Sequence, residues 1–373
     1  MITRKVLYNI PGWRTKRHLV VFESDDWGSI RMPSRIVYDE FLKRGIRVDL
    51  DPYCRYDSIA SPTDLQDLFE ILHSVKDING NPAVITANAL MANPDFEGIK
   101  NSDFQCYSFE PFTKTIADRF GKSAFEVWKQ GMAEHVFRPQ FHGREHVNIK
   151  KWLAVLQKGE SVTRTAFDLG TWGLTQIADP SIKDYYMSAL CSGLDQDIEQ
   201  YNAILAEGLD LFRGIFGFSS DSFIATTYEW SPKIEPGLKS NGIKYIQGAI
   251  TQKIPIDDDH IVRVRYNGFQ GTRTKNGLIR LFRNCFFEPS TNPNRDFVSD
   301  CLHRIDIAFK WHKAANICTH RLNFIGSIDP ANTARNLPLF KKLLFEIVKK
   351  WPDVEFVSSD QLGRIIEETR YPD

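Results

Sequence analysis

Residues 18–34, HLVVFESDDWGSIRMPS, constrain the fold more than any other stretch of this chain. Four consecutive apolar residues, Leu19 to Phe22, open it, and a short apolar run closed by polar residues is typical of a strand buried on both faces. Asp25 and Asp26 follow closely. Adjacent carboxylates at the end of a buried strand repel each other unless a cation or a proton-sharing partner is present. The plain alternative is a loop with two solvated acids before a glycine turn.

The composition gives no argument for a nucleic-acid or membrane-surface partner. The chain has 373 residues, with 47 basic and 47 acidic side chains, so its formal net charge of zero gives no argument for a nucleic-acid partner. No apolar run approaches the length of a transmembrane helix, and the basic N-terminus lacks the apolar segment of a signal peptide. The six cysteines show no CxxC spacing, which is typical of reduced thiols. We expect a cytoplasmic protein without a membrane span; its oligomeric state is not fixed by the sequence.

Helical and strand-like patterns alternate along the chain. In the first half we expect a second buried strand at 81–90, loops at 46–62 and 95–120, and helices at 35–45, 62–77, 123–136, 149–158 and about 193–213. In the second half we expect helices at about 232–240, 296–313, 331–350 and 360–368, and strands at 215–218, 243–248, 261–266, 283–288, 316–322 and 354–358. This alternation predicts an α/β fold, first a (β/α) barrel and second an open doubly wound sheet.

Two histidines lie four residues apart in the segment HGREH. On a helical turn, His142 and His146 would lie on one face, where two imidazoles and a carboxylate can hold one metal ion. The alternative is a packed or surface histidine pair. HGREH is not the HExxH motif of zinc proteases, because Glu145 adjoins the second histidine and not the first.

A third histidine, His320, ends the apolar stretch of ANICTHRLNF. Catalytic groups of α/β barrels collect at the carboxyl ends of strands, so His320 is expected to face an active site. A histidine satisfied within the core or a loop is the alternative.

The order of these segments resembles the polysaccharide deacetylases, the NodB-homology enzymes of carbohydrate esterase family 4. SDDWG resembles their first motif, HGREH their His-x3-His motif, and NICTHRLNF their late strand ending in a catalytic histidine. EFVSSDQLGRII resembles their last strand and helix, and SFIATTYEW stands at their third motif. The resemblance spans about residues 18–368. It implies a single catalytic domain over residues 1–373, folded as a distorted seven-stranded NodB-type barrel with insertions.

The resemblance also implies roles for five residues. Asp26, His142 and His146 would bind a divalent metal, usually zinc in this family, while Asp25 would be the general base and His320 the general acid. Hydrolysis of an amide or ester needs a nucleophilic water, stabilisation of an oxyanion and a proton for the leaving group, and this set can supply all three.

The implied substrate is a carbohydrate, and several large side chains near the motifs are candidate contacts. Aromatic rings can stack on sugars, although buried core is the commoner fate of such residues. The expected contacts are Trp27, Arg144, Tyr228, Trp230 and Arg321.

The chain also departs from the family pattern. The family has an arginine in its third motif that contacts the base, but in FIATTYEW Ile224 stands near that place. The segment 284–290, NCFFEPS, stands where an Asp-rich fourth motif is expected. Extra length between residues 46 and 140 and between 160 and 210 is expected to shape the substrate site.

Three functions remain open from the sequence. The leading one is a metal-dependent hydrolase that removes N- or O-linked acetyl groups from a sugar. The second is a glycoside hydrolase that pairs Glu23, Asp25 or Asp26 with Glu229 or Glu288 and needs no metal. The third is a non-catalytic sugar-binding relative, which would have no use for a base and an acid together.

Overall fold

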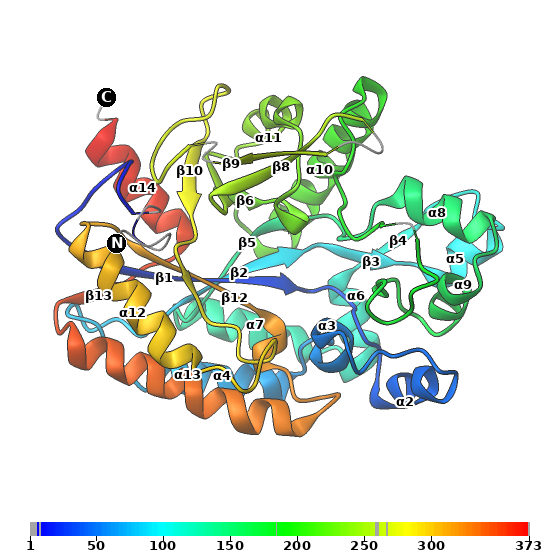
Figure 1. Ribbon diagram of the computed structural model, residues 1–373, viewed down its shortest axis with the longest axis horizontal. Helices are drawn as coiled ribbons and strands as arrows, with labels where there is room; N and C mark the ends of the chain where they lie inside the picture. The colour runs from blue at the N-terminus through cyan, green and yellow to red at the C-terminus, as the bar shows by residue number, and fades with distance from the viewer. Residues whose placement is uncertain (1–5, 7–8, 184, 258–260, 266–267, 372–373) are drawn as a thin grey trace.

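The centre of the molecule is a curled parallel sheet (Figure 1). The computed structural model describes residue 6 and residues 9–183, 185–257, 261–265 and 268–371. The strand order is β10-β7-β6-β5-β2-β1-β12-β11, and β13 pairs with β1 beside this path. The strands are β1 (His18–Trp27), β2 (Ile85–Leu90), β5 (Phe137–Gly143), β6 (Ser222–Ile224), β7 (Tyr245–Gly248), β10 (Ile279–Phe282), β11 (Cys285–Phe286), β12 (Ala315–His320) and β13 (Val354–Phe356). Two small antiparallel pairs lie outside the sheet, β3 (Ala92–Pro94) with β4 (Phe109–Pro111) and β8 (Thr251–Pro255) with β9 (Ile261–Arg265).

The two edges of the sheet almost meet. The edge strands β10 and β11 are separated along the chain by only Arg283 and Asn284, so the sheet must curl round until one edge reaches the other. The expected α/β class is therefore confirmed, and the parallel sheet is curled into a half-barrel that is consistent with the expected barrel. Within the described residues the path contains eight strands, which does not confirm the seven-stranded form that the resemblance implied.

Helices cover the outside of the sheet, and α4, α7, α12 and α13 lie along one side of it in Figure 1. Helix α4 begins where the sequence supplies a cap, because Ser61 and Asp64 form a capping box at its start. The helices are α2 (Arg35–Lys43), α3 (Pro52–Tyr56), α4 (Pro62–His73), α5 (Phe96–Asn101), α6 (Phe112–Phe120), α7 (Ala124–Ala133), α8 (Ile149–Gln157), α9 (Ser161–Asp168), α10 (Asp195–Phe216), α11 (Glu235–Ser240), α12 (Phe297–Lys310), α13 (Pro330–Lys350) and α14 (Ser359–Arg370). In the part of the chain that is described, no helix is long and apolar enough to cross a membrane.

Three of the expected elements were wrong. The loop predicted at 95–120 contains α5, β4 and α6, and the loop predicted at 46–62 contains α3. The strand predicted at 215–218 is instead the end of α10, which stops at Gly217 with a φ of 75°, and the strand begins at Ser222. The apolar run that suggested a strand there belongs to the buried face of a long helix, an ambiguity that short apolar runs carry. Residue 266, the last of one predicted strand, lies outside the described residues.

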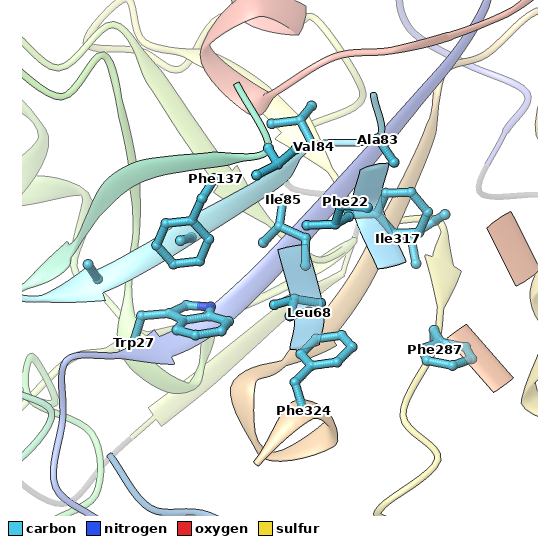
Figure 2. Close-up of a cluster of buried hydrophobic side chains, with 14 of the residues drawn as sticks. Phe22, Trp27, Leu68, Ala83, Val84, Ile85, Phe137, Phe287, Ile317 and Phe324 are labelled. Carbon is cyan, nitrogen blue, oxygen red and sulfur yellow. The ribbon is translucent and has the colours of Figure 1, made fainter. Parts of the chain in front are cut away.

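The two faces of β1 serve different purposes because successive side chains alternate. Val20 and Phe22 face the covering helices, and Figure 2 shows Phe22 among Leu68, Ile317 and Phe324. Leu19 and Val21 belong to a separate apolar cluster inside the curl, which includes Tyr245, Ile279, Leu362 and Ile366.

Helix α14 supplies two residues of that inner cluster, so it closes the amino end of the barrel. The next inward residues of β1 are Glu23 and Asp25, both buried. The interior thus changes from apolar to charged toward the carboxyl ends of the strands, where ligand sites of parallel barrels are found.

Candidate active site

Both acids at the end of β1 line the same cavity. In a regular strand, neighbours such as Asp25 and Asp26 face opposite sides. The pairing of β1 with β2 shifts register between Ser24 and Trp27, and Asp26 has a φ of 74°, which is unusual outside glycine. Such strained residues cluster at functional sites. The bulge places the two carboxylates side by side at the mouth of the barrel.

Asp26, His142 and His146 converge as expected. Asp26 Oδ1 lies 3.4 Å from His142 Nε2 and 3.6 Å from His146 Nε2, and one ligand atom from each residue lies within 4.8 Å of the others. The reason differs from the expected helical turn: His142 is near the end of β5, and His146 lies in the loop that follows. The turn out of the strand brings the two imidazoles together.

The protonation state of these groups fits a metal site. Nδ1 of His142 lies 2.9 Å from the carbonyl oxygen of Ile224, so it can donate a proton there and leave Nε2 as a lone-pair ligand. Burial lowers the pKa of His146 to about 3, which keeps its imidazole neutral. The pKa of Asp26 is well below its usual value, because the neighbouring histidines outweigh the effect of burial. Two imidazoles and one carboxylate are a donor set that suits zinc.

Arg283 holds the neighbouring carboxylate of Asp25. Its Nη1 and Nη2 each donate to one oxygen of Asp25 at 2.6 Å, and its Nε donates to Glu23 at 2.6 Å. Burial alone would raise the pKa of Asp25, but the guanidinium outweighs burial and lowers it. Asn88 donates a further hydrogen bond to Asp25 at 2.7 Å.

Arg283 is a site residue that the sequence did not predict. The expected arginine was sought in the third motif, where Ile224 instead offers its carbonyl oxygen to His142. Arg283 reaches Asp25 from the two residues that join the edges of the sheet. The only signal in the sequence is an arginine that directly follows the strand-like stretch Ile279–Phe282, and the structure shows that this arginine is buried.

His320 ends β12 and is paired with Glu288. His320 Nδ1 lies 2.6 Å from Glu288 Oε1, while Nε2 lies 3.7 Å from Asp25 Oδ2. Burial by itself would lower the pKa of His320, but the Glu288 carboxylate outweighs it and raises the pKa to about 9. Asn323 donates to the other oxygen of Glu288 at 2.7 Å. Glu288 belongs to the segment 284–290, which the sequence analysis placed at a fourth motif.

A second group of side chains has ligand atoms close enough together to hold a metal ion: Glu288, Cys318 and His320. Its charges argue against one, because Arg283 Nη1 lies 3.3 Å from Cys318 Sγ and would repel a cation. Burial also raises the pKa of Cys318 to about 12, so the thiolate that binds metals is disfavoured.

An open cavity of about 530 Å³ contains the five residues of the expected centre. The rest of its wall comes mainly from segments outside the central sheet: Arg31, Asp51, Tyr53, Thr175, Gln176, Ile177, Tyr185 and Met187. Several of these positions fall in the two regions of extra length that were expected to shape the site.

Two of the five expected substrate contacts are core residues instead. Trp27 is 1% exposed, packs edge-on against Phe137 at 4.9 Å (Figure 2), and donates to Ser24. Trp230 is buried in the same cluster of side chains and donates to Glu235. Neither lines the cavity, because the strand and loop that carry them turn these rings toward the helices.

The two arginines expected to bind substrate are held in ion pairs away from the cavity. Arg144 pairs with Glu145 and Glu207, and its guanidinium lies over the ring of Phe109. Arg321 is fully buried and donates twice to Asp57 at 2.9 Å.

Tyr228, the fifth expected contact, does line the cavity. Its hydroxyl accepts a hydrogen bond from Arg283 at 2.9 Å.

Only some of the acids that the glycoside hydrolase alternative requires are accessible to a substrate in the cavity. Glu23 is completely buried beneath Arg283 and Ser359. Glu229 is buried and lines a different cavity. Glu288 is engaged by His320 and Asn323. Asp25 and Asp26 alone among these acids line the active-site cavity.

Comparison with known proteins supports the fold. No protein-family model matches the chain, and no curated protein matches it in sequence. The structure of a candidate glycoside hydrolase/deacetylase from Parabacteroides distasonis aligns with a TM-score of 0.50 and 10% identity, over 96% of this chain and 74% of that one. At 10% identity the likeness shows a shared fold alone, so the function has to be inferred from the residues of the site.

Two further structures align at lower scores. A candidate polysaccharide deacetylase from Pseudomonas aeruginosa PAO1 gives a TM-score of 0.47 and 10% identity, over 96% of this chain and 93% of that one. The 4-alpha-glucanotransferase from Thermococcus litoralis gives 0.45 and 9% identity, over 93% of this chain and 40% of that one.

Proposed function

We propose that this protein is a metal-dependent hydrolase that removes N- or O-linked acetyl groups from a carbohydrate. The observation that carries the proposal is the meeting of two separate sets of groups in one cavity. Asp26, His142 and His146 form a metal-ligand set, and Asp25 and His320 form an acid–base pair beside it. Neither a glycoside hydrolase nor a sugar-binding module needs both sets.

The residues of the proposed metal site would leave at least one position open for water and substrate. A divalent cation such as zinc, bound by Asp26, His142 and His146, would lower the pKa of a water molecule and polarise the acetyl carbonyl. Because His142 can donate Nδ1–H to Ile224, its Nε2 is free to bind the metal. Burial keeps His146 neutral, so one of its two ring nitrogens also carries a lone pair for this purpose.

Asp25 is proposed to accept a proton from the attacking water. Arg283 keeps it ionised and fixed in direction, so it is a base at neutral pH without needing to lose a proton first. His320 is proposed to donate a proton to the nitrogen or oxygen that leaves the acetyl carbon. Its raised pKa of about 9 keeps it protonated and able to act as an acid at neutral pH.

The test is acetate release from a panel of N- and O-acetylated saccharides, together with elemental analysis of the purified protein. We expect about one divalent metal per chain, loss of activity on chelation and recovery when zinc is added back. Cleavage of glycosidic bonds that survives chelation would favour the second function. Saccharide binding without any turnover by the metal-loaded protein would favour the third.

A further inference from the structure

Arg31 lines the active-site cavity without an acceptor for its charge. Within the described part of the chain its guanidinium makes no hydrogen bond and no ion pair, and its Nε is buried without a partner. Arg31 is half-buried, and a guanidinium that loses part of its solvation without gaining an acceptor is uncompensated, so a binding group from outside the chain is the natural complement.

Aromatic rings on two sides hold this guanidinium in place. Its central carbon lies 5.3 Å from the ring centre of Tyr53 and 5.1 Å from that of Trp172. Gly173 makes room for the side chain, because a Cβ there would stand 2.7 Å from Arg31 Cδ. The stem and the plane of Arg31 are therefore fixed before any ligand arrives, which reduces the entropy that binding must overcome.

The same two rings connect Arg31 to the catalytic groups. Trp172 stacks on His146 with ring centres 5.5 Å apart, and Tyr53 meets His320 edge-on at 5.4 Å. A single aromatic ring thus lies between Arg31 and the proposed metal ligand His146, and another lies between Arg31 and the proposed acid His320. A substrate whose acetyl group is at the metal can place a neighbouring substituent on Arg31.

The nearby carboxylates do not neutralise Arg31 by contact. Asp51 accepts hydrogen bonds from Thr175 and from the backbone of Tyr53. Asp57 is paired with Arg321, and Asp26 belongs to the metal-ligand set.

We infer that Arg31 binds a negatively charged group on the substrate, so that the cavity selects an acidic acetylated saccharide over a neutral one. The group is a carboxylate, as in a uronic acid, or a phosphate ester, since both match the fork of a guanidinium. This inference rests on the proposed function for the acetylated part of the substrate. The binding of the anion by Arg31 does not depend on the proposed function.

The first test is calorimetric titration of the full chain, as purified and again after chelation, with sodium glucuronate, glucose 6-phosphate and methyl glucoside. We expect at least one of the two acids to bind more tightly than the neutral sugar, and the tighter one identifies the source of the charge. Arg31→Met keeps the stem between the rings and removes the charge, so it should weaken acid binding by roughly 10- to 100-fold and leave neutral binding unchanged. Arg55→Met, at an exposed arginine on helix α3, is the matched control and should change neither.

Arg31→Lys keeps the inference testable if the methionine variant does not fold. It retains the charge without the fork, so acid binding should weaken by less than in Arg31→Met but measurably. Equal binding of acids and neutral sugar by the unaltered protein, or an acid preference that persists when Arg31 is replaced, would overturn the inference. If acid binding depends on Arg31 but no acetate is released from any acidic or neutral substrate, the proposed function fails and the anion site stands.

Discussion

Arg283 binds both oxygens of Asp25, with Nη1 and Nη2 each 2.6 Å from one of them. The arginine comes from the short segment between the edge strands, and the aspartate lies near the end of the central strand β1. The curl of the sheet, which brings its two edges close together, therefore fixes the direction of the proposed base. A guanidinium fork can hold a carboxylate in this way, whereas an ammonium group cannot.

Arg283→Lys should impair catalysis more than metal binding. Lysine retains the charge but loses the two parallel hydrogen bonds, so Asp25 can rotate away, and a small misplacement of a catalytic group costs about 10²-fold in rate. Weaker stabilisation of the ionised form should also raise the pKa of Asp25 and move the acidic limb of the rate profile to higher pH. Kinetics and elemental analysis measure both effects. Arg280→Lys in the adjoining strand is the control; an unchanged profile in Arg283→Lys would contradict the positioning role.

Asp25→Asn should retain the metal and lose most of the activity. The amide keeps the shape of the side chain and removes the basic oxygen, and the loss of general base catalysis typically costs roughly 10²–10⁴-fold in rate. The comparison is turnover of a competent acetylated saccharide at equal metal content. Asp39→Asn, an exposed acid on α2, should behave as the unaltered protein. Unchanged turnover in Asp25→Asn would remove Asp25 from the mechanism.

His142→Ala should lose most of the bound metal and most of the activity, because it removes one of three convergent ligands. Elemental analysis of the purified variant is the direct measurement. His73→Ala removes a surface imidazole that pairs with Glu134 and should keep full metal content. Full occupancy in His142→Ala would show that the metal, if one is bound, lies elsewhere.

Arg321→Met should destabilise the protein without changing substrate recognition. It leaves Asp57, which is 1% exposed, as an unpaired buried carboxylate, and breaking such a pair typically costs about 3–5 kcal/mol. Urea unfolding measures the loss in the free energy of unfolding. Replacing both residues, Arg321→Met with Asp57→Asn, should recover part of it because no charge is then buried alone. A raised KM with unchanged stability would instead restore Arg321 as a substrate contact.

The sequence could predict residues whose position follows from one strand, but not contacts made by closing the sheet. Asp25 and His320 can be predicted because each closely follows an apolar run, and those runs belong to β1 and β12. Arg283 was missed because its contact with Asp25 depends on where the two sheet edges meet. Trp27 was misplaced because its residue type does not reveal which way a bulged strand turns it. A single domain over residues 1–373 and a cytoplasmic location stay predictions.

Glu288→Gln should move the alkaline limb of the rate profile to lower pH. The acid must be protonated to act, so the rate falls as His320 loses its proton, near its raised pKa of about 9. The glutamine amide cannot supply the negative charge that raises the pKa of His320. The alkaline limb should therefore shift toward the ordinary histidine pKa of 6.5. Glu346→Gln, on the outside of α13, is the control and should leave the limb in place.

The same pair makes a prediction about stability. Because folding raises the pKa of His320, its contribution to the free energy of unfolding is fully present below the ordinary value of 6.5 and is lost as the pH rises through about 9. Glu288→Gln should narrow the pH range over which this stabilising contribution of His320 is lost. Denaturant unfolding across this pH range measures the change. His320→Ala adds a kinetic test: an activated ester needs little proton donation, so its hydrolysis should fall less than that of an acetamide. If the limb and the stability window both stay unchanged in Glu288→Gln, another group titrates there and His320 is not the acid.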